Sequence, residues 1–415
     1  MKVLVAFGTR PEAIKLAPVI RELREQSQAY GGDPLVRVCI TAQHREMLDQ
    51  ALRLFSITPD YDLNVMEDHQ TPTQVAAGVL TRLEPILLGE RADWVLVQGD
   101  TTTVAAASLA AFYARAKVGH VEAGLRTGDK WQPFPEEINR RVAGGIADLH
   151  FAPTERARKN LLREGIPDDR IRVTGNPVID ALQWVSSLPP TPEVDRLLRQ
   201  LGIVAEPEHR FPVSPAFCSL PSALCLLPTA SPSPRPPGTP APLLIFVTAH
   251  RRENFGSPLE DICLALRDLA TQYQDDIRIL YAVHMNPNVR EPVHRLLGDV
   301  PNITLTPPLD YLATVHLLKR AYLVLTDSGG LQEEAPSLGK PVLVLREVTE
   351  RPEGVEAGTA KVVGVKRQDI LRETVRLLED PVAYAAMASA VNPYGDGKAS
   401  QRIVQALLDS ERVRQ

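Results

Sequence analysis

Short apolar runs alternate along this chain with longer stretches whose apolar residues recur at helical spacing. Short apolar runs bounded by polar residues are typical of buried strands, and their alternation with helices is typical of βαβ units in a parallel sheet. In the first half, the expected strands are residues 3–7, 36–41, 94–98, 118–121, 150–152 and 171–174. The expected helices are residues 11–26, 43–54, 73–88, 102–115, 135–147 and 155–164.

The same alternation restarts after residue 242. The pattern therefore predicts an α/β protein with two Rossmann-like, doubly wound parallel sheets in series. We place the first domain at residues 1–180 and the second at 181–395. Ligands of such sheets bind beyond the carboxyl ends of the strands. The expected strands of the second half are residues 243–248, 277–283, 303–305, 322–325 and 342–345.

Proline is so dense in residues 206–242 that neither a helix nor a sheet can persist there. We expect this stretch to be a disordered or loosely packed insert within the second domain. The alternative is a docking segment for a proline-binding partner.

Composition narrows the class of protein. Hydrophobic content of 44% and charged content of 23% are ordinary for a globular protein, and the net charge of −5 does not favour nucleic acid or an anionic membrane. No apolar run reaches the roughly 18 residues of a membrane span. The four cysteines form no C-x-x-C pair, so we expect neither a zinc site nor disulfides, and a cytoplasmic location. They are Cys39, Cys218, Cys225 and Cys263.

The most informative stretch is residues 325–354, where a strand ends in TDSGG before a helical segment. Backbone amides at a helix N-terminus, approached through Ser328, Gly329 and Gly330, form an anion site. Glu333 and Glu334 lie one turn further on and suit the hydroxyls of a sugar. The stretch therefore predicts a site for a nucleoside diphosphate with its ribose.

Charged residues also follow the strands of the first half. Arg10 and Lys15 come after the first strand, where a cationic pair can hold a pyrophosphate; the alternative is two solvated side chains. Asp100 and Glu136 lie at helix starts, where a capping or an ordinary acidic residue is equally expected. Glu122 ends an apolar strand between glycines, where a carboxylate is unfavourable unless it is used or paired, for example with the arginine at 126.

The second half adds His250 at a strand end, placed to act as an acid, a base or a phosphate donor, and His284 in a similar but more ambiguous setting. Arg351 is the expected phosphate arginine, the alternative being a surface loop pair. Neither G-x-G-x-x-G nor G-x-x-x-x-G-K-[ST] occurs, which disfavours a dinucleotide cofactor and a P-loop. No metal-ligand spacing occurs either.

In this order the motifs GTRPEAIKLAP, TAQHREMLDQ, GDTTT, GHVEAGLRT, PFPEEINRR, HRREN, LTDSGGLQEEAPSLGKPV, TERPEG and NPYGDGKA span nearly the whole chain. The set resembles the non-hydrolysing UDP-N-acetylglucosamine 2-epimerases. The resemblance implies the GT-B fold with UDP in an interdomain cleft, a C-terminal helix (396–415) that packs on the first domain, and a homodimer. It also implies elimination of UDP to 2-acetamidoglucal and its re-addition, with no cofactor.

The resemblance implies roles for individual residues. Lys15 and His250 would stabilise the leaving UDP, and Asp100, Glu122 and Glu136 would transfer protons. Substrate binding is implied for Arg10, Ser328, Gly329, Gly330, Glu334 and Arg351. Gln43, His44 and Gln70 match a region where some relatives bind a second UDP-N-acetylglucosamine as activator. The alternatives are a GT-B glycosyltransferase that uses a UDP-sugar and a hydrolysing 2-epimerase.

Overall fold

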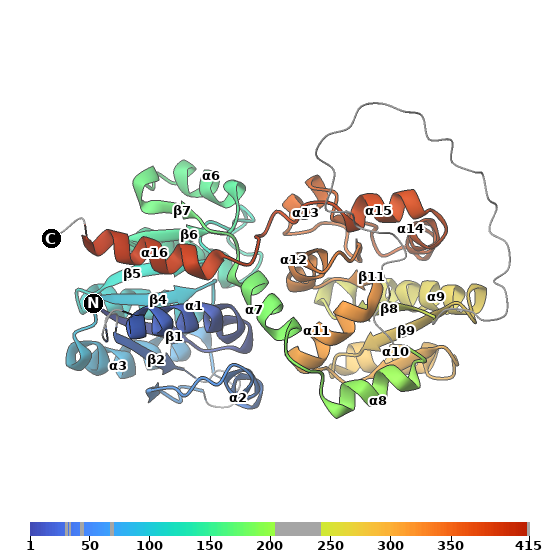
Figure 1. Cartoon of the computed structure of the whole chain (residues 1–415), viewed down its shortest axis with the longest axis horizontal. Helices are drawn as coiled ribbons and strands as arrows, with labels where there is room; N and C mark the ends of the chain where they lie inside the picture. Colours follow the sequence, from blue (N-terminus) through green and yellow to red (C-terminus); the bar gives the residue numbers. More distant parts are fainter. Residues whose placement is uncertain (30–31, 33–34, 42–44, 67–69, 204–241, 413–415) are drawn as a thin grey trace. The chain divides into compact units, whose positions relative to one another are not determined.

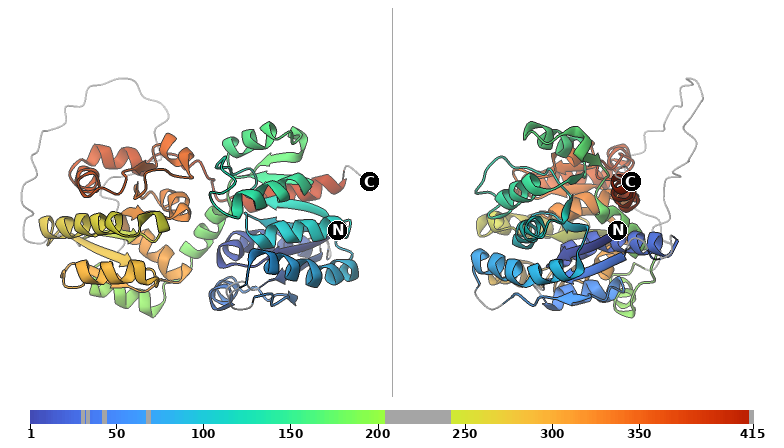
Figure 2. Two further views of the ribbon diagram at one scale, coloured as in Figure 1. Left: turned by 180° about the vertical axis from the view of Figure 1, so that it is seen from behind. Right: turned by 90° about the vertical axis from the view of Figure 1, so that its left-hand side faces the viewer.

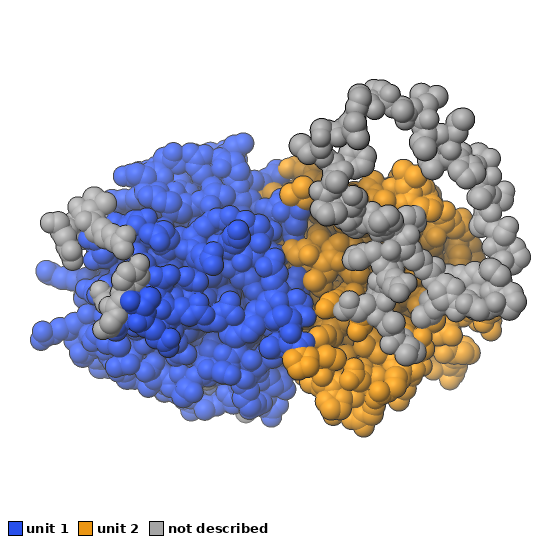
Figure 3. Space-filling model, viewed as in Figure 1, with its two compact units in different colours: residues 1–188, 392–415 blue, residues 189–391 orange. Residues whose placement is uncertain are grey.

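The computed structural model describes residues 1–29, 32, 35–41, 45–66, 70–203 and 242–412 (Figure 1). They form two compact units, the first made of Met1–Leu188 with Asn392–Gln415 and the second of Pro189–Val391 (Figure 3). The predicted insert at 206–242 lies, apart from its last residue, outside the described residues.

The first unit is built on a parallel sheet of seven strands in the order β3-β2-β1-β4-β5-β6-β7. Its inner strands β1 and β4 are apolar except for one terminal residue each, because helices cover both faces of the sheet. The strands are β1 (Lys2–Phe7), β2 (Leu35–Ile40), β3 (Tyr61–Asp62), β4 (Trp94–Gln98), β5 (Lys117–Val121), β6 (Leu149–Ala152) and β7 (Ile171–Val173).

Helices α1, α7 and α16 pack together on one face of this sheet, and α3, α4 and α5 pack side by side on the other (Figures 1 and 2). The last helix, α16, thus belongs to the first unit although it follows the second unit in the chain. The helices are α1 (Arg10–Ala29), α2 (Arg45–Leu54), α3 (Pro72–Glu90), α4 (Thr102–Tyr113), α5 (Glu136–Ile146), α6 (Glu155–Arg163), α7 (Pro177–Ser186) and α16 (Ala399–Arg412), with a 3-10 turn, η1 (Asp168–Arg170).

The second unit contains a parallel sheet of six strands in the order β10-β9-β8-β11-β12-β13. The strands are β8 (Leu243–Thr248), β9 (Ile277–Ala282), β10 (Ile303–Thr306), β11 (Ala321–Thr326), β12 (Val342–Val344) and β13 (Ala360–Val362). The helices are α8 (Pro192–Gln200), α9 (Ser257–Gln272), α10 (Pro287–Leu297), α11 (Tyr311–Arg320), α12 (Gly329–Ser337), α13 (Pro352–Glu356), α14 (Arg367–Glu379) and α15 (Pro381–Ala388), with the 3-10 turn η2 (Arg252–Asn254).

The observed strands confirm the predicted parallel α/β class, and two strands were missed. β3 and β13 are the outermost strands on one side of their sheets. They are two and three residues long, and each mixes polar with apolar residues. Strands this short show no periodic pattern in the sequence. Their formation depends on pairing with the neighbouring strand more than on their own residues.

Each sheet reverses its strand order at one point. In the first unit β1 lies beside β4, and in the second β8 lies beside β11. The connections that leave two such strands run to opposite faces of the sheet, so a crevice opens beyond their carboxyl ends. The loops after these four strands carry several of the charged groups singled out from the sequence.

Among the described residues, no helix combines the length and the apolar character that crossing a bilayer requires.

Two buried histidines lie side by side on neighbouring strands of the first sheet. His120 of β5 is in register with His150 of β6, and both are almost fully buried. His120 Nε2 makes a hydrogen bond of 2.7 Å with the Gly99 carbonyl. Burial lowers the pKa of His120 to about 4 and that of His150 to about 3. Both histidines are therefore neutral in the folded protein at neutral pH.

These histidines predict a loss of stability in acid. Between pH 6.5 and about 4 the unfolded chain protonates both histidines while the folded chain does not, so stability falls as the pH falls. Each histidine should contribute roughly 2 kcal/mol of this loss between pH 8 and 5. Thermal unfolding across this range should show a shallower loss for His150→Leu than for the unmodified chain. Equal slopes would contradict the buried, neutral state.

Candidate active site

The carboxylate of Glu122 lies at the carboxyl end of β5 and is held by three donors. Lys15 Nζ lies 2.6 Å from Oε1 and 2.8 Å from Oε2. Asn176 Nδ2 donates to Oε1 at 2.9 Å, and Gln98 Nε2 donates to Oε2. Glu122 is only 7% exposed, and burying a charge is unfavourable unless it is paired and hydrogen-bonded. The lysine and the two amides provide that pairing.

The backbone at Glu122 is left-handed, with φ of +63°, which is uncommon for a residue with a side chain. The chain then turns through Gly124 (φ +88°), where a side chain would approach the Ala157 carbonyl to 2.3 Å. Arg126 pairs with Glu164 at 2.7 Å instead of turning back to Glu122. The alternative that Glu122 is a structural partner of Arg126 is therefore wrong.

The loop after β1 is shaped by Glu12, a buried residue that the sequence analysis did not single out. Its Oε2 accepts hydrogen bonds from the amides of Gly8 (2.9 Å) and Thr9 (2.6 Å). Its Oε1 accepts from the Thr101 hydroxyl at 2.7 Å, which ties this loop to the one after β4. Burial raises the pKa of Glu12 above its usual value, and these hydrogen bonds oppose that shift. Arg10, the first residue of α1, follows directly from this loop.

Asp100 lies in the loop after β4 and pairs with Arg140 of α5. The guanidinium donates to Asp100 Oδ2 from Nε (3.0 Å) and Nη2 (2.6 Å), and Nη1 lies 3.1 Å from Glu137 Oε2. Burial lowers the pKa of Arg140, but the neighbouring charge of Asp100 outweighs it and the pKa is raised. The helix cap is Thr101, whose side chain accepts from the amide three residues on, so the capping interpretation of Asp100 is wrong.

Glu136 opens α5 in the first turn, where the helix dipole favours an acidic side chain. Glu122 directly follows β5, and Asp100 is the second residue after β4; the two strands are paired in the sheet. The two loops lie against each other at Gly99, where a side chain would be 3.5 Å from Glu122 Oε2. The structure thus brings Glu122 together with Lys15, beside the loop that carries Asp100.

In the second unit, His250 follows β8 and is held by Asp327, which follows β11. His250 Nδ1 lies 3.1 Å from Asp327 Oδ1. Asp327 Oδ2 accepts from the amides of His250 (2.6 Å) and Arg251 (2.7 Å) and from Asn254 Nδ2 (3.1 Å). Burial would raise the pKa of Asp327, but these hydrogen bonds and the imidazole hold it below its usual value. Asp327 therefore fixes the orientation of the imidazole through Nδ1 and leaves Nε2 for a hydrogen bond or proton transfer to a ligand.

His284 stacks on His250, with ring centroids 5.6 Å apart and planes inclined by 12°. Its Nδ1 accepts from the Asn286 amide at 3.1 Å. Burial, followed by the neighbouring His250, lowers the pKa of His284 below its usual value. His284 therefore faces His250 as a neutral ring at neutral pH.

The N-terminus of α12 is lined by two guanidinium groups. A side chain at Gly329 would lie 3.8 Å from Arg351 Nη2 and 3.9 Å from Arg251 Nη2. Arg351 Nε donates to Glu333 Oε1, which holds the guanidinium beside the helix start. Amides at a helix N-terminus together with two arginines suit a doubly charged anion. Arg251 was missed, because its sequence context also fits a loop-stabilising charge.

Glu334, expected to bind a ribose, is buried in the same helix. Tyr311 donates its hydroxyl to Glu334 Oε1 at 2.7 Å. Burial and the adjacent carboxylate raise the pKa of Tyr311 well above its usual value, so the tyrosine remains a donor. Glu334 Oε2 lies beside Gly330, 3.7 Å from where a side chain would be.

Of the residues matched to an activator region, Gln43 and His44 lie outside the described residues. Gln70 is described, and its Nε2 donates to the Val65 carbonyl at 2.8 Å. Within the described part of the chain, histidine, cysteine and carboxylate side chains form no group that could hold a metal ion.

Besides Glu12, five residues that organise these groups were not assigned from the sequence. Gln98 and Asp327 directly end or follow buried strands, a position that signals a role at the sheet edge. Asn176 precedes a proline, a position typical of a helix cap. Arg140 and Arg251 stand in charged stretches, where an arginine is typically solvent-exposed. Their partners are distant in sequence, so only the fold reveals them.

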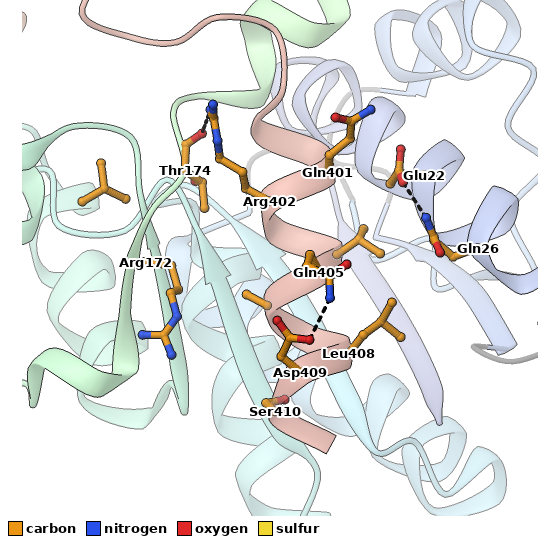
Figure 4. A pocket seen from close by; sticks show the side chains of 13 residues that line it. Glu22, Gln26, Arg172, Thr174, Gln401, Arg402, Gln405, Leu408, Asp409 and Ser410 are labelled. Atoms are coloured by element: carbon orange, nitrogen blue, oxygen red, sulfur yellow. Dashed lines mark hydrogen bonds between the residues drawn. The ribbon is translucent and has the colours of Figure 1, made fainter. Parts of the chain in front are cut away.

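A separate cavity of about 760 Å³ lies within the first unit, beside α16 (Figure 4). Glu22 of α1, Arg172 of β7, and Arg402 and Asp409 of α16 contribute to its lining. Charges of both signs line it, and none of the predicted site residues that the structure describes does.

The two doubly wound parallel sheets are those of a GT-B fold, and solved structures with the same architecture include UDP-GlcNAc 2-epimerases. The sequence profile of UDP-N-acetylglucosamine 2-epimerases matches residues 32–211 and 235–408. The chain belongs to this family.

Individual relatives are similar over nearly their full length. UDP-N-acetylglucosamine 2-epimerase of Escherichia coli K12 is 52% identical over 412 residues, covering 99% of both chains. The UDP-GlcNAc 2-epimerase of Neisseria meningitidis, solved with UDP-GlcNAc, is 45% identical with a TM-score of 0.80, covering 99% of this chain and 100% of that one. The S. aureus protein MnaA, solved with UDP, is 42% identical with a TM-score of 0.80, covering 99% and 97%.

Proposed function

We propose that this chain interconverts UDP-N-acetylglucosamine and UDP-N-acetylmannosamine by inverting C2 of the sugar. The observation that carries the proposal is the buried Glu122 carboxylate, paired with Lys15 at the carboxyl edge of the first sheet. Family membership and full-length similarity to UDP-N-acetylglucosamine 2-epimerases support the proposal.

The C2 proton of a sugar is barely acidic, so its direct removal is too slow. In the proposed path the C1–O bond breaks and UDP leaves with the bonding electrons. A base of the enzyme takes the C2 proton, and the C2–H electrons form the C1=C2 bond of 2-acetamidoglucal. The reverse addition of UDP, with a proton delivered to the opposite face of C2, gives the epimer. Atoms and charges balance, and no redox cofactor is needed.

We assign the proton transfers to the first unit. Glu122, Asp100 and Glu136 are the candidate acids and bases. Asp100 and Glu122 lie just after β4 and β5, and Glu136 is the first residue of α5, the helix that follows β5. Lys15 and Arg10 supply positive charge for the departing diphosphate. Lys15 already contacts Glu122, so one cation would serve both the carboxylate and the leaving group.

We assign UDP to the second unit. The amides of residues 328–330, with Arg351, suit the diphosphate, and Glu334 suits the ribose hydroxyls. His250, oriented by Asp327, would donate a proton or a hydrogen bond to UDP as it leaves. Gln43, His44 and Gln70 remain candidates for an activator site, and the cytoplasm remains the proposed location.

We also propose that the chain forms a homodimer through the layer of α3, α4 and α5. Phe112 and Tyr113 of α4 are 61% and 63% exposed, and Leu88 of α3 is 59% exposed. On α5, Ile138 and Val142 are also exposed. Large apolar side chains on three packed helices of one layer are typical of a protein–protein interface, and a second copy presents the same surface.

The reaction can be followed by NMR of the purified protein with UDP-N-acetylglucosamine in D2O. We expect UDP-N-acetylmannosamine, deuterium at C2 in both sugars, and little free sugar, because the proton exchanges with solvent while UDP is detached. Retention of the C2 proton would exclude the elimination path. Accumulation of UDP with free N-acetylmannosamine would identify a hydrolysing enzyme, and transfer of the sugar to an added acceptor would identify a glycosyltransferase.

Glu122→Gln and His250→Asn test the two units separately. Each should lower kcat by at least about 10²-fold, because each removes a group able to transfer a proton. Circular dichroism and UDP binding should be retained in Glu122→Gln. Thr191→Ala, which removes the cap of α8, is the matched control and should keep normal turnover. Near-normal kcat in either test variant would give that residue a structural role.

The dimer can be tested by light scattering coupled to size exclusion. Phe112→Glu with Tyr113→Glu should reduce the mass from two chains to one, because two charges cannot be buried in an apolar interface. Val382→Glu, on the exposed face of α15 in the second unit, is the matched control and should remain dimeric. A monomeric unmodified chain, or a dimer that survives the double substitution, would contradict the proposed surface.

A further inference from the structure

Asn176 is fully buried at the start of α7 and uses both ends of its side chain. Its Oδ1 accepts from the Val178 amide at 3.2 Å, which caps the helix. Its Nδ2 donates to Glu122 Oε1 at 2.9 Å. Because the oxygen must face an amide and the nitrogen a carboxylate, only one orientation of the side-chain amide satisfies both neighbours.

The backbone of Asn176 is held by the segment through which the chain returns to the first unit, residues 392–398, here called the return segment. The Asn176 amide donates to the Tyr394 carbonyl at 2.7 Å. Gly175 adopts a φ of +86°, and a side chain there would lie 3.2 Å from Gly395 Cα. The two backbones therefore approach so closely that neither can shift independently.

Further contacts hold α7 against the return segment and the start of α16. Tyr394 is 1% exposed and packs against Val178 and Ile179 of α7. Asp180 Oδ1 accepts from the Ser400 amide at 2.8 Å, at the start of α16. The first turn of α7 is thus fixed on one side by the return segment, while Asn176 reaches Glu122 on the other.

We propose that Asn176 is a positioning residue that fixes the Glu122 carboxylate for proton transfer, and that the return segment sets the place of Asn176. This inference rests on the proposed catalytic role of Glu122. Lys15 contacts both carboxylate oxygens and so does not define the rotation of the carboxylate by itself. Asn176 on Oε1 and Gln98 on Oε2 define it, at a residue whose own backbone is in an uncommon conformation.

The variant that isolates this role is Asn176→Ser. Serine keeps an oxygen that can cap α7, but it is too short to donate to Glu122. We expect kcat to fall about tenfold or more while KM stays within about twofold, because a misplaced base slows the chemical step without changing ground-state binding. Asn176→Asp also keeps the cap but faces Glu122 with a like charge, so its kcat should fall further.

A double-mutant cycle with Glu122→Gln separates positioning from structure. If Asn176 acts through Glu122, then Asn176→Ser should cause no further fall in kcat when residue 122 is already glutamine. The exchange of C2 hydrogen in D2O should follow the same pattern. The matched control, Thr191→Ala, removes a helix cap in the second unit and should change neither kcat nor KM.

The outcomes distinguish this inference from the proposed function. Equal falls in kcat caused by Asn176→Ser in both backgrounds, or a change confined to KM, would overturn the positioning role and leave the catalytic role of Glu122 intact. Near-normal turnover of Glu122→Gln alone would overturn both. If Asn176→Ser unfolds, Asn176→Asp takes its place in the cycle, because its like charge acts on Glu122 and its kcat should fall no further once Glu122→Gln has removed that charge.

Discussion

The constraint on which the first unit depends is the burial of a charged carboxylate at the end of an apolar strand. Glu122 can occupy that position only because a cation and two amides reach it. These donors come from α1, the end of β4 and the start of α7, which are far apart in the chain. The strand order, which sets β1, β4 and β5 side by side, brings Lys15 and Gln98 to Glu122, and the Tyr394 carbonyl holds the backbone of Asn176.

In both units a buried carboxylate orders the loop that follows a central strand. After β1, the buried Glu12 gathers two successive backbone amides, and Asp327 does the same for the loop after β8. In each unit a carboxylate that faces the protein interior orders the loop that carries the functional cation or imidazole. This explains why both loops can be irregular and still hold their side chains in fixed positions.

The sequence predicts much of this arrangement, for identifiable reasons. Strands such as β1 and β8 are uninterrupted apolar runs, and the polar residues that follow them had to lie at the carboxyl edge of a parallel sheet. Their pairing could not be predicted. Arg126 lies four residues after Glu122 but turns to Glu164, while the actual partner, Lys15, lies on another helix. Such choices depend on strand order and backbone twist, which a linear pattern does not contain.

The position of α16 has a consequence for how the chain is made. This helix packs against α1 and α7, yet the ribosome produces it only after the whole second unit. While the second unit is being synthesised, the first unit therefore lacks α16, and the surface of α1 that packs against α16 stays exposed. The core of the first unit is thus completed only after the second unit has been synthesised, although β1 precedes every other strand of both sheets.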